Sequence, residues 1–209
     1  VGDNEPAEAA AFGGTQHLTP VALYPEMAHY TVFVDAISKC WAATGLRVGW
    51  AVGPQWIIER MGPLIGHMGA WAALPEQLAS ARLMRQPELM GNWMGEFKAS
   101  ATARLDALYD GLMSLKAEGL PVDALAPQGA IYLTAKVDLI GRALADGRVL
   151  DENGVRQLLL NEAGVAVVPF SAFDYPAGSG WMRFSIGAVS QADCEAAISR
   201  LGALLRRVL

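Results

Sequence analysis

Apolar residues recur along the chain with spacings that predict both helices and strands. The clearest pattern runs from Pro87 to Glu118, where large apolar residues return every three or four positions. This spacing places them on one face of a helix roughly 45 Å long. Gly119 is a suitable residue to end that helix. We expect so long a helix to connect two domains.

The segment before this helix contains two short apolar stretches. Residues 31–35 (TVFVD) are rich in β-branched residues and predict a buried strand, and residues 47–53 (RVGWAVG) predict a second strand. Pro54 suits the first turn of a following helix, and Pro63 is expected to end it. Pro75 then opens another predicted helix.

The C-terminal part of the chain changes to an alternation of strands and helices. Residues 130–137 and 181–187 alternate apolar with polar positions, and residues 165–169 form a third apolar stretch. The two helices expected here start at sequences typical of N-caps, Asp151 before one and Ser190 with Asp193 before the other. The predicted unit has the order β-α-β-β-α and the layers of an α/β sandwich.

Three parts follow from these elements. Residues 1–86 precede the long helix, residues 87–118 form it, and residues 119–209 form a smaller α/β domain. The chain has 209 residues, of which 53% are hydrophobic and 18% charged, so it can bury a sizeable core.

Charge and cysteine usage exclude several classes of protein. The net charge of −5 argues against nonspecific nucleic-acid binding, which requires a basic face. No apolar run reaches the roughly 18 residues of a membrane helix. Cys40 and Cys194 form no disulfide framework and have no zinc spacing, and the histidines also lack metal-ligand spacing. We therefore expect a cytoplasmic protein with no metal site.

Two cations stand where the hydrophobic pattern predicts the start of the interior. Lys39 follows the first predicted strand, and Arg47 lies in a stretch with glycine and tryptophan. Buried lysine and arginine are rare unless they are paired or used in function. Taken alone, Lys39 would more often be a solvated residue and Arg47 an ion-pair partner, so the surrounding sequence decides.

That surrounding sequence resembles a known motif. Residues 38–39 (SK) and 43–50 (ATGLRVGW) resemble the cofactor-lysine motif of class I/II aminotransferases, which are pyridoxal phosphate (PLP) enzymes of fold type I. Further segments resemble motifs of that family in the expected order: GAIYL (129–133), VAVVPFSAF (165–173) and WMRFSIG (181–187). The resemblance implies an α/β fold with the end of the large PLP-binding domain, a connecting helix and a small C-terminal domain.

The resemblance implies roles for four residues. Lys39 would form the Schiff base with PLP, which is the electron sink of the reaction, and would then shuttle the substrate proton. Arg47 would bind the PLP phosphate, and Ser38 would add a hydroxyl near it. Arg183 would bind the substrate α-carboxylate, the alternative being a solvent-facing arginine. Some relatives have a phosphate-binding serine where this chain has Ala36, so one ligand fewer is expected.

The family also has residues upstream of the lysine that this sequence lacks. A phosphate cup, an asparagine and an aspartate paired with the pyridine nitrogen are not found in residues 1–30, and Asp35 is too near Lys39 for that last role. We therefore expect the C-terminal portion of an aminotransferase, with little or no activity alone. The resemblance further implies amino acid and 2-oxo acid substrates and a homodimer, and we expect exposed apolar surface to cause self-association.

Two alternatives stay open. A β-lyase or decarboxylase of the same fold would also use Lys39 and Arg183, and a β-lyase would release ammonia and pyruvate. A noncatalytic aminotransferase-like ligand-sensing domain would be supported by a basic winged-helix segment, which the sequence does not contain. The fold alone does not choose between these functions.

Overall fold

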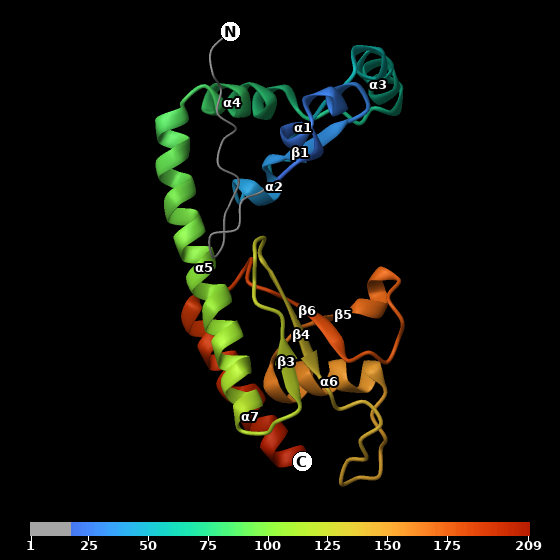
Figure 1. Cartoon of the computed structure of the whole chain (residues 1–209), viewed down its shortest axis with the longest axis vertical. Coiled ribbons are helices and arrows are strands. Elements are labelled where there is room, and N and C mark those ends of the chain that lie inside the picture. The colour runs from blue at the N-terminus through green and yellow to red at the C-terminus, as the bar shows by residue number, and fades with distance from the viewer. Residues whose placement is uncertain (1–17) are drawn as a thin grey trace. The chain divides into compact units, whose positions relative to one another are not determined.

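The computed structural model describes residues 18–209, which divide into two compact units. The N-terminal unit comprises residues 18–97, and the C-terminal unit comprises residues 98–209. The boundary falls inside the 31-residue helix α5 (Pro87–Ala117), so this helix contributes to both units (Figure 1). The long helix predicted from the apolar spacing is thereby confirmed, with five buried residues every three or four positions from Ala101 to Leu115.

The N-terminal unit is mostly helical and contains one two-stranded antiparallel ladder. In the ladder, Phe33 lies opposite Val52 and Ala36 lies opposite Gly49. The elements, in chain order, are α1 (Pro20–Leu23), η1 (Pro25–His29), β1 (Phe33–Ala36), α2 (Ile37–Cys40), β2 (Gly49–Val52), α3 (Gln55–Met68) and α4 (Leu74–Met84). The two strands predicted in this part of the chain are therefore present.

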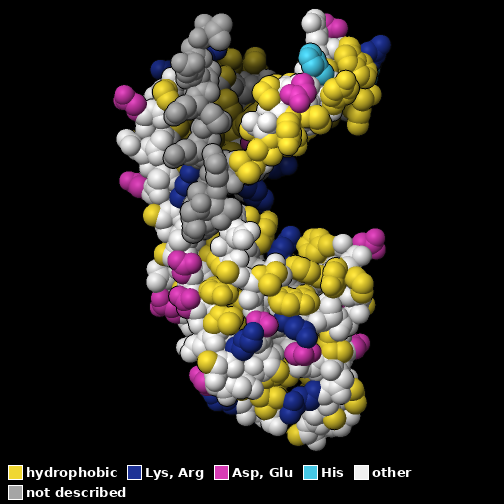
Figure 2. All heavy atoms as spheres, in the orientation of Figure 1, with side chains coloured by type: hydrophobic (Ala, Val, Ile, Leu, Met, Phe, Trp, Pro, Cys, Tyr) yellow, Lys and Arg dark blue, Asp and Glu magenta, His cyan; other side chains and the backbone are white. Residues whose placement is uncertain are grey.

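The burial predicted for the first strand is wrong. Phe33 is 45% exposed and Val34 is 71% exposed. In the described part of the chain β1 pairs with β2 alone, and a two-stranded ladder has too little surface to bury a face by itself. Other large apolar side chains of this unit are exposed as well, and hydrophobic side chains gather over α3 in Figure 2. The expected self-association stays a prediction.

The helix end predicted at Pro63 is also wrong. Helix α3 continues past this proline to Met68 and ends at Gly69, which has the left-handed φ of 64°. The Gly69 N–H donates to the Gly66 carbonyl, and the Ala70 N–H donates to the Ile65 carbonyl. A proline removes one backbone hydrogen bond from a helix, whereas a left-handed glycine directs the chain away from the helix axis.

The C-terminal unit is built on a four-stranded antiparallel sheet. Its spatial order is β3-β4-β6-β5, and Leu133 on β4 lies opposite Phe184 on β6. The strands are β3 (Val122–Ala124), β4 (Tyr132–Val137), β5 (Val168–Pro169) and β6 (Trp181–Ser185). The sequence pattern did not predict β3, because three residues are too few to show an alternation.

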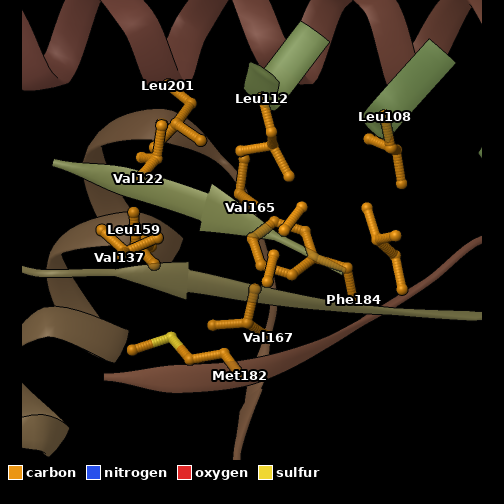
Figure 3. Packing of buried hydrophobic residues seen from close by; sticks show 14 of the residues in the cluster. Leu108, Leu112, Val122, Val137, Leu159, Val165, Val167, Met182, Phe184 and Leu201 are labelled. Carbon is orange, nitrogen blue, oxygen red and sulfur yellow. The ribbon is translucent and has the colours of Figure 1, made fainter. Parts of the chain in front are cut away.

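Three helices cover one face of this sheet and form the core with it. Helices α6 (Glu152–Ala163) and α7 (Gln191–Val208) pack with the second part of α5 against the apolar side of the strands (Figure 3). The predicted caps are confirmed: the Asp151 side chain accepts from the Gly154 N–H, and Ser190 with Asp193 forms a capping box. The unit is a two-layer α/β sandwich, as predicted.

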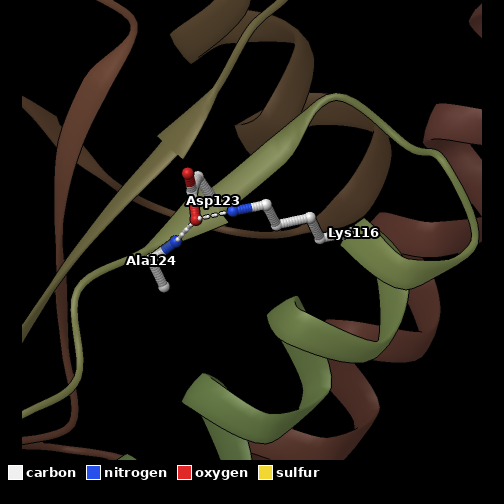
Figure 4. Close-up of polar contacts among 3 residues, drawn as sticks. All are labelled: Lys116, Asp123 and Ala124. Carbon is white, nitrogen blue, oxygen red and sulfur yellow. Dashed lines mark hydrogen bonds and ion pairs between the residues drawn. The ribbon is translucent and has the colours of Figure 1, made fainter.

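The edge strand β3 is also tied to α5 by a polar contact. Asp123 accepts a hydrogen bond from the Lys116 Nζ at 2.7 Å and from the Ala124 N–H at 2.9 Å (Figure 4). These two donors, Lys116 first, hold the pKa of the Asp123 carboxyl below its ordinary value.

Among residues 18–209, no helix combines the length and the apolar character that a bilayer span requires.

Candidate active site

Arg183 lies on the central strand β6, on the face of the sheet that the helices do not cover. Its neighbours Met182 and Phe184 are 0% and 4% exposed and point into the core. Successive side chains of a strand point to opposite faces, so Arg183 faces away from that core. The alternation of residues 181–187 is therefore confirmed, and it places Arg183 on the face opposite Met182 and Phe184.

Two aromatic rings lie against the Arg183 guanidinium. Its Cζ is 4.4 Å from the ring centroid of Tyr132, which lies on the adjacent strand β4. The same atom is 4.8 Å from the ring centroid of Phe173, at the end of the 3₁₀ helix η2 (Phe170–Phe173). A planar cation stacks favourably on aromatic faces. The rings therefore restrain the guanidinium without accepting from its N–H groups, which have no acceptor among residues 18–209.

The hydrogen-bond donors of Arg183 lack partners within the described chain. Its Nε is buried and has no hydrogen-bond partner, and no salt bridge within residues 18–209 includes this residue. A buried charged donor left unsatisfied costs about 1–3 kcal/mol or more. An anion that binds the guanidinium would remove this cost, and a carboxylate suits its planar fork of donors. Arg183 is therefore a candidate for binding an anion.

Lys39 lies in the N-terminal unit, near the end of the short helix α2. Its side chain is exposed, so the expectation that the interior begins here is wrong for Lys39. The next residue, Cys40, donates its thiol to the Ala36 carbonyl at 3.1 Å. Burial, and secondarily the Asp35 carboxylate, raises the pKa of the Cys40 thiol. The neutral thiol form of Cys40 is therefore favoured beside Lys39.

Arg47 follows in the loop between α2 and β2, and it is exposed as well. The expected burial is therefore wrong here too, because the residues from Ala42 to Arg47 form a surface loop. Both of these residues have left-handed backbones, with φ of 49° and 57°. A non-glycine residue in that region costs of order 1–3 kcal/mol and is more frequent at functional sites. The Arg47 Nη1 donates to the Thr44 carbonyl at 2.9 Å, and its other N–H groups have no described acceptor.

The donors of this segment fit the groups of PLP. An exposed primary amine on Lys39 suits an aldehyde, and an exposed guanidinium with free donors on Arg47 suits a phosphate dianion. Ser38, on the same helix as Lys39, adds a hydroxyl. No cluster of three or more potential metal ligands occurs among residues 18–209.

The four predicted residues lie in two units. Ser38, Lys39 and Arg47 belong to the N-terminal unit, and Arg183 belongs to the C-terminal unit. Tyr132 and Phe173 lie in the motifs GAIYL and VAVVPFSAF, but the sequence pattern predicted no role for either residue. The parity of positions along β4 could have placed Tyr132 on the Arg183 face. Phe173 follows a different strand in a 3₁₀ turn, and no periodicity of the sequence places it.

Comparisons with known proteins point to one family. The sequence model described as "Aminotransferase class I and II" matches residues 8–201. The chain is 30% identical over 203 residues to an aspartate aminotransferase of Rhizobium meliloti strain 1021, and the match covers 96% of this chain and 47% of that relative.

Solved structures show the same likeness. The structure of the aspartate aminotransferase from Rhizobium meliloti superposes with a TM-score of 0.82 at 28% identity, over 96% of this chain and 48% of the other. An aromatic aminotransferase from Pyrococcus horikoshii OT3 gives a TM-score of 0.80 at 29% identity, over 97% and 50%. The chain spans about half the length of the relatives it matches.

Proposed function

Because the chain belongs to the class I and II aminotransferase family, we propose that it supplies part of an aminotransferase active site. The reaction would move an amino group between an α-amino acid and a 2-oxo acid. The observation that carries this proposal is the Arg183 guanidinium, which contacts two aromatic rings and has a buried Nε with no partner among residues 18–209. A carboxylate is common to amino acids and 2-oxo acids, so one arginine can serve both substrates.

The N-terminal unit would hold the cofactor. PLP, when bound, supplies the electron sink that lets the substrate Cα lose its proton. The Lys39 amine would attach the cofactor aldehyde and later hold and return that proton. The Arg47 guanidinium would bind the phosphate with the donors that Thr44 does not use, and Ser38 would add a hydroxyl.

The setting of the reaction is part of the same proposal. We propose a cytoplasmic homodimer whose substrates are amino acids and 2-oxo acids. Support comes from the family, from two cysteines that form no disulfide within the described chain, and from the exposed apolar side chains of the N-terminal unit.

Carboxylate binding by the chain tests the proposal. Pyruvate, a 2-oxo acid, would be titrated into the wild-type chain and into Arg183→Gln, with calorimetry or NMR as the readout. Loss of the charged donor should weaken binding by roughly tenfold or more. Arg148→Gln is the matched control, because Arg148 is a surface arginine of the same unit that is already paired with Asp146. Equal affinity of wild type and Arg183→Gln would contradict the proposal.

A second assay separates amino transfer from the lyase alternative. The chain would be incubated with PLP, pyruvate and unlabelled amino acid donors, and the products would be analysed. Alanine formed from pyruvate indicates amino transfer. Ammonia released from the donor without alanine would indicate a β-lyase instead, and would overturn the proposed reaction while leaving the carboxylate role of Arg183 intact.

A further inference from the structure

We propose that Glu152 is a positioning residue for the carboxylate site, because it fixes the loop of residues 170–178 and so holds Phe173 against Arg183. The inference rests on the proposed role of Arg183 in binding a substrate carboxylate. Glu152 is the first residue of helix α6, whereas Arg183 lies on strand β6. The loop between β5 and β6 contacts both residues: it binds Glu152 by hydrogen bonds and carries Phe173 to Arg183.

Each carboxylate oxygen of Glu152 receives one hydrogen bond from this loop. The Ser171 hydroxyl donates to Oε2 near the start of the loop, and the Gly178 N–H donates to Oε1 at 3.3 Å near its end. A single half-buried side chain on a helix thus binds both ends of the segment that carries Phe173. Hydrogen bonds to an ionised acceptor are stronger than those between neutral groups.

Little else ties this loop to the rest of the unit. Its remaining backbone contacts are internal, from the Asp174 N–H to the Ser171 carbonyl and from the Tyr175 N–H to the Phe170 carbonyl. Within residues 18–209, Glu152 is the only hydrogen-bond partner of the loop outside the loop itself. Phe173 and Tyr175 are also about half exposed, so apolar burial restrains the loop only weakly.

Phe173 is the side chain through which the loop contacts the Arg183 guanidinium. The Tyr132 ring, which also contacts the guanidinium, belongs to β4, whose position is set by pairing with β6 along its length. Phe173 is carried by the loop, in which its ring also packs edge-on against that of Phe170, so its distance of 4.8 Å from the Arg183 Cζ depends on the loop. Without that ring the guanidinium can leave the plane in which its donors meet a carboxylate. Binding would then have to restrict a mobile side chain, which weakens affinity.

A simpler explanation of Glu152 is its place in the first turn of α6, where a negative charge favours the helix dipole. Ser171→Ala distinguishes the two explanations, because it removes one loop contact without changing the charge at the helix. Glu152→Gln instead removes the charge at the helix and keeps both loop contacts. The amide of the new side chain can accept from the Gly178 N–H and form a hydrogen bond with the Ser171 hydroxyl.

The test compares these variants by NMR of the arginine Nε–H groups, with the Arg183 signal assigned by Arg183→Gln, and by titration with pyruvate. We expect Glu152→Ala and Ser171→Ala to shift or broaden the Arg183 Nε–H signal and to weaken pyruvate binding roughly fivefold. Glu152→Gln should stay near wild type. Glu162→Ala is the control, because Glu162 lies at the other end of α6 and pairs with Arg207; it should change neither readout.

The outcomes separate the two proposals. If Glu152→Ala and Ser171→Ala leave both the signal and the affinity unchanged while Arg183→Gln loses pyruvate, the positioning role is overturned and the proposed function stands. If Glu152→Gln behaves like Glu152→Ala while Ser171→Ala behaves like wild type, the helix-dipole explanation replaces ours. If Arg183→Gln binds pyruvate as wild type does, the carboxylate role fails, and the Nε–H signal alone decides whether Glu152 orders Arg183.

Discussion

The Arg183 guanidinium is positioned by ring contacts and by burial. Tyr132 and Phe173 face it at 4.4 and 4.8 Å, and its buried Nε has no described partner. The alternation around Met182 and Phe184 was enough to predict the side of the sheet on which Arg183 lies. The position of Tyr132 follows from the same alternation along β4, whereas Phe173 was not predictable, because it reaches Arg183 from a turn after another strand. Single-strand periodicity carries no information about such a contact.

For Lys39 and Arg47 the sequence indicated the motif but not the exposure of the side chains. Their motif was recognisable, whereas their exposure was not, because the hydrophobic stretch before Lys39 was interpreted as a buried strand. Burial depends on what covers a strand, and β1 is paired with β2 alone in the described chain. The cofactor roles of both residues stay predictions.

Asp123 offers a pH-dependent test at this scale. Its carboxyl pKa is lowered first by the hydrogen bond from Lys116, so the ionised form is favoured in the folded state. The contact therefore stabilises the fold above the ordinary pKa of aspartate, and this contribution is lost as the pH falls through the lowered value. Lys116→Met should raise the Asp123 pKa toward its ordinary value in a carboxyl ¹³C NMR titration.

Lys136→Met is the control for that titration. Lys136 lies opposite Asp123 in the sheet but is only a minor cause of its lowered pKa. Its removal should change the Asp123 titration much less than removal of Lys116. A larger effect from Lys136→Met would show that the Lys116 contact in Figure 4 does not dominate.

At the element scale, helices and caps were the most predictable features. Apolar spacing predicted α5, and side chains with specific backbone contacts predicted the starts of α6 and α7. These signals are local in the sequence, so they can be recognised without knowledge of the fold. Strand β3 and the continuation of α3 past Pro63 were missed, since one depends on pairing with β4 and the other on tolerance of a lost hydrogen bond.

Two glycines of α5 give matched substitutions with opposite expected effects. A Cβ at Gly111 would lie 2.7 Å from an atom of Ile198 on α7, whereas a Cβ at Gly95 would meet nothing within 4 Å. Alanine favours a helix over glycine by about 1 kcal/mol. An overpacked contact costs about 1–3 kcal/mol. Gly111→Ala should therefore lower the free energy of unfolding in urea, and Gly95→Ala should raise it.

The sign of the difference between these variants is the test. Both replacements gain a similar helix propensity, and only the added methyl at Gly111 would meet α7, so destabilisation by Gly111→Ala reports the contact of α5 with α7. A Gly111→Ala chain as stable as Gly95→Ala would mean that Ile198 moves aside without cost and that the close approach of the two helices is not required.

At the scale of the whole molecule, the chain consists of two units that share helix α5, and it spans about half the length of its relatives. The sequence motifs predicted the family and the α/β sandwich of the C-terminal unit. The expected boundaries at residues 86 and 118 stay predictions. Compact units are defined by contacts between distant residues, which local patterns do not report.

The most direct test of the central claim is to reduce a mixture of the chain and PLP with borohydride and to map the modified lysine by mass spectrometry. The sequence has four lysines, and Lys39 is the only one before residue 98. Lys116 and Lys136 are held in salt bridges and serve as internal controls. We predict a visible absorption band that Lys39→Ala lacks and a reduced adduct located on Lys39. An adduct spread over the other lysines, with an unchanged spectrum in Lys39→Ala, would contradict the assignment of Lys39 as the cofactor lysine.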